Sequence, residues 1–86
     1  MVCVELSFTD DTRRLEARPA HRQRLAKLHE QGGLLAAGPW DDDSGALLIF
    51  KLDEQAVREE LRADPYYGAP GVTIASVRSW APVFGV

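Results

Sequence analysis

The apolar residues switch along the chain between the two-residue period of a strand and the longer period of a helix, and the order of these switches limits the possible folds. From Val2 to Phe8 every second residue is apolar, which predicts a half-buried strand. From Arg18 to Gln31 the spacing is helical, and one stripe carries His21, Leu25 and Leu28. The chain therefore begins with a strand followed by a helix.

Two further strands and a second helix follow, and then a last strand. Leu34–Pro39 and Ala46–Leu52 are predicted as strands, and apolar residues on both faces place the latter inside a sheet. Asp53 is suited to cap a helix that Pro65 ends. Apolar positions between Val72 and Trp80 predict the last strand.

The resulting order β-α-β-β-α-β is the signature of the split βαβ, or ferredoxin-like, fold. We expect residues 1–86 to form one α+β domain, with a four-stranded antiparallel sheet and two helices on one of its faces. A looser arrangement with the same element order is the alternative. A chain of 86 residues supports only a modest core, so self-association would help it.

Charge and composition narrow the range of partners. The net charge of -3 argues against a nucleic-acid surface, which needs a basic face. No apolar stretch approaches the length of a membrane span, and the N-terminus has no secretory pattern. Cys3 is the single cysteine and cannot form an internal disulfide. We therefore expect a cytoplasmic protein with neither nucleic acid nor membrane as a partner.

The expected topology brings polar residues from distant segments to one end of the sheet. The first helix begins there with Arg18 and His21, the second strand ends there with Gly38–Pro39, and the second helix ends there with Asp64 and Tyr66. Each segment also has a purely structural explanation, such as a core histidine, a turn or a helix end. Their convergence is what predicts a site.

The chemistry of this end suggests proton transfer. Pro19 is suited to a first helical turn, which places His21 near the positive end of the helix dipole, where neutral imidazole is favoured. Asp64 is expected at the negative end of the second helix, where it needs a donor or cation such as His21 or Arg18. A neutral imidazole oriented by a carboxylate is a general-base arrangement, and Arg18 can bind an anion.

Other chemistry finds little support in the sequence. His21 and His29 are about two helical turns apart and offset in angle, which is poor metal geometry. The acidic run Asp41–Asp43 lacks the alternating spacing of a calcium loop. Phosphate-loop, dinucleotide and nucleophile-elbow motifs are absent, so we expect neither a metal nor a cofactor. The aromatic residues available either for a pocket or for the core are Tyr66, Tyr67 and Trp80.

Several short blocks resemble the YciI-like (YCII-related) family in order and spacing. These blocks, which together cover nearly the whole chain, are Arg18-Pro19-Ala20-His21, Leu28–Gly32, Ala37-Gly38-Pro39, Asp64-Pro65-Tyr66 and Gly71-Val72. The resemblance implies a ferredoxin-like domain that dimerises through its sheet faces, as a dimeric α+β barrel. It also implies that His21 and Asp64 are the suspected acid–base residues. Where the family often has Gly-Ser, this chain has Gly45-Ala46, so a hydroxyl that could line the pocket is missing.

Two functions are compatible with these observations. The first is a cofactor-independent acid–base enzyme of the lyase or isomerase type, acting on a small carboxylated or cyclic substrate. In it His21 moves a proton and Asp64 orients His21, while the expected substrate-binding residues are Arg18, Gly38, Pro39 and Tyr66. The second is a non-catalytic ligand-binding or accessory dimeric module, in which the His21–Asp64 pair only joins the two helices.

The sheet face without helices predicts an interface. Aliphatic side chains on this face are unfavourable in water. We therefore expect a homodimer through the open face, whose residues are predicted to be Cys3, Glu5, Ser7, Leu47, Ile49, Ala75 and Val77.

Overall fold

The computed structural model describes residues 1–86 and contains the expected elements in the expected order. The elements are β1 (Val2–Phe8), α1 (Arg14–Glu30), β2 (Leu34–Pro39), β3 (Gly45–Phe50), α2 (Glu54–Ala63), the short 3-10 helix η1 (Pro65–Gly68) and β4 (Val72–Ser79). The strands form one antiparallel sheet in the order β2-β3-β1-β4. This is an α+β fold compatible with the ferredoxin-like topology.

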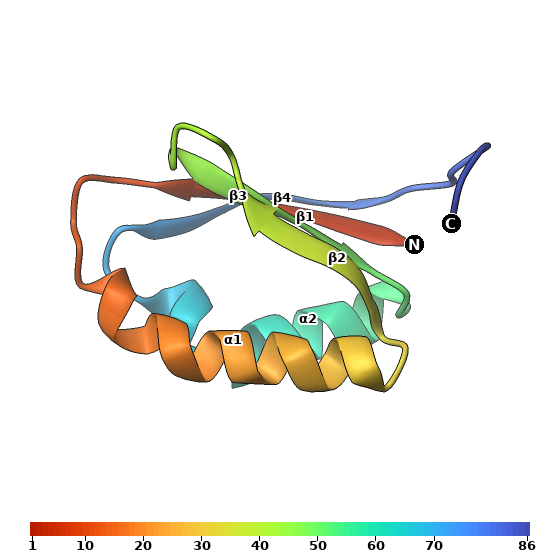
Figure 1. Ribbon diagram of the computed structural model, residues 1–86, viewed down its shortest axis with the longest axis horizontal. Helices are drawn as coiled ribbons and strands as arrows, with labels where there is room; N and C mark the ends of the chain where they lie inside the picture. The colour runs from red at the N-terminus through yellow and green to blue at the C-terminus, as the bar shows by residue number, and fades with distance from the viewer.

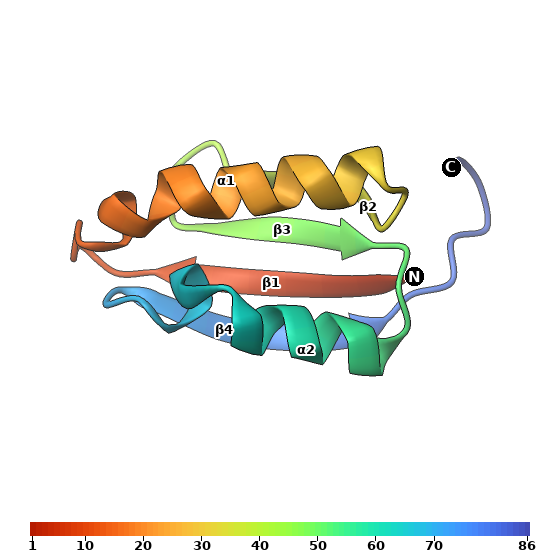
Figure 2. The same ribbon diagram turned by 90° about the horizontal axis from the view of Figure 1, so that it is seen from below.

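Both helices lie on one face of the sheet and leave the other face open (Figure 1). Seen from the helix side, α1 runs along the β2–β3 half and α2 along the β1–β4 half (Figure 2). The alternation along β1 turns Val2, Val4 and Leu6 into the layer between sheet and helices, where they meet Phe50 and Val57. The core thus forms from every second residue of the strand, the ones that face the helices, as the sequence pattern predicts.

Helix α1 begins one turn earlier than the sequence predicts, at Arg14 rather than Arg18. The Asp11 carboxylate accepts a hydrogen bond from the Arg13 backbone N–H at 3.0 Å, which starts the turn. Pro19 consequently lies inside the helix, where the carbonyl four residues before it loses its usual donor. The expectation of Pro19 and His21 in the first turn is wrong, and His21 lies about two turns from the positive end of the dipole.

A bulge in β4 changes which residues occupy the open face. Glu5 pairs with Ser76 and Leu6 with Ile74, so Ala75 has no partner across the β1–β4 ladder. After the bulge, Val77 lies opposite the buried Val4 and packs against the core. The prediction of Val77 on the open face is therefore wrong.

The open face is consequently more polar than expected. Arg78 takes an open-face position opposite Cys3, and its guanidinium donates to Glu5 at 3.5 Å. The aliphatic part of this face is formed by Leu47 and Ile49 of β3, both half-buried. An apolar strip beside an ion pair thus replaces the continuous apolar patch that the sequence predicts.

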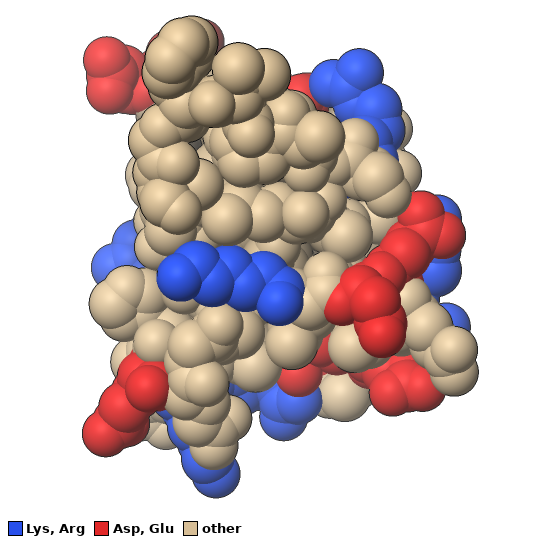
Figure 3. Space-filling model, turned by 90° about the vertical axis from the view of Figure 1, so that its right-hand side faces the viewer, with Lys and Arg blue, Asp and Glu red and all other residues tan.

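The two chain termini lie at the end of the sheet away from the start of α1 (Figure 1). The backbone amide of Trp80 donates to the carbonyl of Met1 at 2.8 Å, after which the chain leaves the sheet. The side chains of Val83, Phe84 and Val86 are exposed. Uncharged side chains form the upper part of this end, and charged ones lie beside and below them (Figure 3). None of the helices has the length and apolarity that crossing a membrane requires.

Candidate functional site

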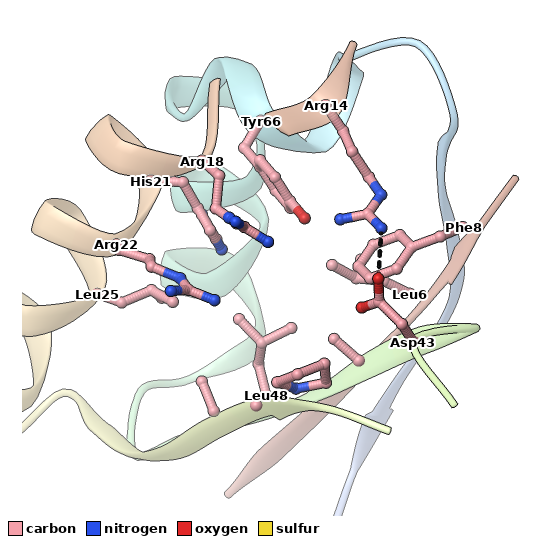
Figure 4. A pocket seen from close by; sticks show the side chains of 14 residues that line it. Leu6, Phe8, Arg14, Arg18, His21, Arg22, Leu25, Asp43, Leu48 and Tyr66 are labelled. Carbon is pink, nitrogen blue, oxygen red and sulfur yellow. Dashed lines mark hydrogen bonds and ion pairs between the residues drawn. The ribbon is translucent and has the colours of Figure 1, made fainter. Parts of the chain in front are cut away.

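A cavity of about 280 Å³ opens between α1 and the β2–β3 half of the sheet, at the end where β1 finishes. Its sheet side is apolar and includes Leu6, Leu48 and Ala46. Figure 4 shows polar side chains of α1 and η1 pointing into it from the opposite side. The residues predicted from sequence that line this cavity are Arg18, His21, Gly38, Pro39 and Tyr66.

His21 forms a hydrogen bond to Asp64. Nδ1 of the imidazole lies 2.7 Å from Oδ2 of Asp64, and both side chains are buried. Because a carboxylate only accepts, Nδ1 carries the proton, and the lone pair of the neutral ring is on Nε2. Nε2 is therefore the nitrogen available to a ligand in the cavity.

Asp64 has a second partner that fixes its orientation. It ends α2 and precedes η1, and its Oδ1 accepts the backbone N–H of Tyr66 at 3.0 Å. Asp64 does not line the cavity itself but a second hollow, which is formed by residues of α1 and the start of η1. The carboxylate therefore supports the histidine from outside the cavity, and the expectation that Arg18 is an alternative partner is not met.

Two tyrosines fix the plane of the imidazole. The Tyr66 ring stacks on His21 with centroids 4.0 Å apart and planes at 9°, and the Tyr67 ring meets it edge-on at 5.2 Å. The Tyr66 hydroxyl points into the cavity (Figure 4). Burial raises the pKa of Tyr67, with a further contribution from the negative charge of Asp64. Tyr67 is thus a packing residue with a neutral hydroxyl, while Tyr66 both packs and faces the ligand space.

Three arginines of α1 line the cavity at intervals of four residues. Arg14, Arg18 and Arg22 share one helix face because residues four apart are neighbours on a helix surface. Figure 4 shows the side chains of all three extending toward the cavity. The only carboxylate in the lining is that of Asp43, so the lining carries an excess of positive charge.

Arg14 and Asp43 form an ion pair across the mouth of the cavity. Nη2 of Arg14 donates to Oδ2 of Asp43 at 3.0 Å, and the guanidinium lies 4.1 Å from the centre of the Phe8 ring. The Arg14 side chain is 9% exposed, whereas that of Asp43 is 60% exposed. Nε of Arg14 is buried and has no acceptor.

Sequence reasoning missed Arg14 and Arg22 as cavity residues. The apolar periodicity places Arg14 before the helix and Arg22 on its polar side. The recurrence of arginine at every fourth position was the available signal, but its use required the earlier helix start. Trp80, a candidate for the pocket, lies instead at the opposite end of the sheet, where its backbone bonds to Met1.

No group of three or more His, Cys, Asp and Glu side chains is arranged to hold a metal ion. The cavity instead offers one imidazole nitrogen, guanidinium groups and an apolar floor. Such a set suits the binding of a small anion that also has an apolar part.

Comparison with known proteins identifies the family of this chain. The sequence profile of the YCII-related domain matches residues 1–81. The chain belongs to the YCII-related family. Protein YciI of Escherichia coli O6:H1 (strain CFT073) is 36% identical over 83 residues, which cover 84% of this chain and 85% of that protein. Protein YciI of Shigella flexneri is similar to the same extent. The resemblance seen in the sequence blocks is thus confirmed, and this YCII-related chain matches nearly the whole length of its relatives.

Proposed function

We propose that this YCII-related protein is a cofactor-independent acid–base enzyme of the lyase or isomerase type, acting on a small carboxylate. The observation that carries the proposal is the orientation of His21. Its Nδ1 donates to the buried Asp64, and its Nε2 is left for a ligand in a positively charged cavity. A histidine fixed in one tautomer beside ligand space is the arrangement that general-base catalysis requires.

In the proposed step, Nε2 of His21 takes a proton from a carbon of the substrate. The electron pair of the broken C–H bond forms a new carbon–carbon double bond. Either a leaving group departs with its own bonding pair, which is elimination, or an existing double bond shifts and the imidazolium returns the proton to another carbon, which is isomerisation. Asp64 stabilises the imidazolium until it gives up the proton, which goes to the leaving group or to water after elimination and back to the substrate in isomerisation.

Binding is assigned to the rest of the lining. Arg18 and Arg22 pair with a substrate carboxylate, because both guanidinium groups extend toward the cavity without a carboxylate partner within the chain (Figure 4). Gly38 and Pro39 form the β2 side of the cavity, and the Tyr66 hydroxyl can hydrogen-bond to the substrate.

The burial of the His21–Asp64 pair also supports a second function. Asp64 is 2% exposed and His21 is 6% exposed, and the pair joins α1 to the start of η1. In a non-catalytic ligand-binding or accessory module, this bond would serve only to fix the helices. Such a role predicts a large loss of stability on substitution of either residue, whereas a catalytic pair predicts little loss or even a gain.

The proposal can be tested before the substrate is identified. Small unsaturated carboxylic acids are incubated with the protein in D₂O, and NMR detects deuterium uptake, double-bond migration or release of a leaving group. We expect His21→Gln to lower any observed rate by about 10²-fold or more, while His29→Gln, an exposed histidine near the end of the same helix, leaves it unchanged. A His21→Gln protein that is folded and as active as the wild type would overturn the mechanism.

We further propose that the protein is a homodimer formed through the open sheet face. Leu47 and Ile49 lie there without cover from a helix, and the Glu5–Arg78 pair lies beside them. A second copy packed on this face would remove the aliphatic side chains from water.

A further inference from the structure

Arg14 uses only half of its capacity to bind a carboxylate. In an arginine, Nε and Nη2 share one edge of the guanidinium and can hold both oxygens of one carboxylate. Arg24 does this in the same chain, where Nε and Nη2 each lie 2.9 Å from an oxygen of Glu60. Arg14 bonds to Asp43 through Nη2 alone, and its Nε is buried without an acceptor. A buried charged donor without a partner is unusual and requires an explanation.

Asp43 can leave Arg14 without a change in the backbone. The turn between β2 and β3 is held by the Asp43 amide, which donates to the Trp40 carbonyl at 2.9 Å. It is also held by the Asp42 carboxylate, which accepts the Ser44 amide at 3.0 Å. Neither bond involves the Asp43 carboxylate, which is more than half exposed. Rotation about the side-chain bonds is therefore sufficient to move this carboxylate into solvent.

We propose that Arg14 is a further carboxylate-binding residue of the cavity, beside Arg18 and Arg22, and that Asp43 occupies it as an internal competitor when the cavity is empty. An incoming carboxylate accepts from Nη2 and Nε together, and Asp43 turns outward into water. The Phe8 ring beneath the guanidinium gives an apolar or aromatic part of the same ligand a surface next to this position. The inference rests on the proposed function only in assigning the ligand to the same cavity.

The proposal implies that Asp43 lowers the affinity of the cavity for a carboxylate ligand. While Asp43 holds Arg14, only the fraction of molecules with the carboxylate turned away can bind, and the apparent affinity is lowered by that fraction. Removal of the competing charge should therefore strengthen ligand binding. An acidic residue at the entrance of an anion site would otherwise be unfavourable, because it repels the ligand.

Benzoate is a suitable probe, since it joins one carboxylate to one apolar ring and undergoes no reaction here. Its binding is followed by NMR through the Nε–H signal of Arg14, at constant ionic strength. We expect Asp43→Asn to tighten benzoate binding by about fivefold or more. The matched control is Asp41→Asn, which removes the same charge from the same turn at an exposed residue outside the cavity lining. It should change the affinity by much less.

Substitution of Arg14 provides the second arm of the test. Arg14→Lys keeps the positive charge but cannot hold two carboxylate oxygens at once, and we expect benzoate affinity to fall by about tenfold. In the Arg14→Lys protein, Asp43→Asn should no longer tighten binding. Should Arg14→Lys fail to fold, the comparison of Asp43→Asn with Asp41→Asn decides by itself.

Three results would overturn the inference. These are equal effects of Asp43→Asn and Asp41→Asn, an Arg14 Nε–H signal that benzoate does not move, and absence of binding to both the wild type and Asp43→Asn. Failure of the proposed enzymatic function is distinguishable, because it appears as His21→Gln turnover equal to that of the wild type while benzoate binding behaves as expected.

Discussion

Nδ1 of His21 and Oδ2 of Asp64 lie 2.7 Å apart although 43 residues separate them in the sequence. The contact joins the second turn of α1 to the junction of α2 and η1. Because the other carboxylate oxygen accepts the Tyr66 amide, one aspartate fixes both the tautomer of the histidine and the path of the chain into η1. These two roles can be separated by mutation.

Asp64→Asn and Asp64→Ala should have different effects on stability. The asparagine keeps an oxygen for the Tyr66 amide but presents its NH2 group, a donor, to Nδ1 of His21, whereas alanine loses both partners. We expect Asp64→Ala to lower the free energy of unfolding by about 1 kcal/mol more than Asp64→Asn does. Urea denaturation measures the difference.

The same pair of variants tests catalysis. If Asp64 orients and stabilises His21, the activity of Asp64→Asn should fall by up to about 10⁴-fold, the loss that the same change causes in a Ser-His-Asp triad. Asp53→Ala is the control for capping, since Asp53 caps α2 through the Ala56 amide at an exposed site. It should lose about 1 kcal/mol of stability and no activity. An Asp64→Asn protein with full activity would favour the structural role.

Tyr67→Phe should stabilise the protein near neutral pH. The Tyr67 hydroxyl is buried and has no hydrogen-bond partner, so folding removes it from water without compensation. Deletion of an unsatisfied buried hydroxyl is expected to raise the free energy of unfolding by about 1 kcal/mol. A clear loss of stability in urea denaturation would contradict this expectation.

The stabilisation of the folded state by Tyr67→Phe should increase in alkaline solution. Burial raises the pKa of Tyr67, so the folded protein keeps a proton that the unfolded chain loses above about pH 10. The unfolded state then binds fewer protons, and stability falls as the pH rises from the unfolded pKa toward the folded one. The slope for one such group is at most about 1.4 kcal/mol per pH unit. The Phe variant lacks this contribution. A difference in the free energy of unfolding between the two proteins that stays constant up to about pH 11 would argue against a raised pKa of Tyr67.

Gly45→Ala should be strongly destabilising, in contrast to Gly38→Ala. A Cβ at Gly45 would overlap the carbonyl oxygen of Leu6 on the adjacent strand β1. A Cβ at Gly38 would meet no atom within 4 Å. We expect losses of about 2–3 kcal/mol for Gly45→Ala and changes within about 0.5 kcal/mol for Gly38→Ala. Thermal and urea unfolding of both variants provides the comparison.

The proposed homodimer predicts a specific effect of charge on the open face. Light scattering at micromolar concentration should give the dimer mass for the wild type. Ile49→Lys, which places a charge on that face, should give a folded monomer. The Gln55→Lys protein, in which the charge is added at an exposed position of helix α2, should remain a dimer. A monomeric wild type would refute the assembly.

The sequence by itself determined the order of the elements and the end of the sheet at which the polar residues meet. Period-two apolar residues from Val2 to Phe8 and the helical stripe around His21 are local patterns, and local patterns decide strand against helix. Once the order is β-α-β-β-α-β, connectivity alone brings His21 and Asp64 to the same end of the sheet. The family blocks led to the same two residues.

Only the tertiary structure decided the details that define the site. The helix start at Arg14 follows the local Asp11–Arg13 turn, but it also buries Arg14 against Phe8, a contact that no local pattern contains. The bulge that turns Val77 inward is a property of the pairing between strands. The partners of the side chains at the site depend on distances of a few ångströms between segments remote in sequence. His21 bonds to Asp64 and Arg14 to Asp43, while Arg18 and Arg22 line the cavity. Periodicity determines which face a residue occupies, but only packing determines which atom it touches.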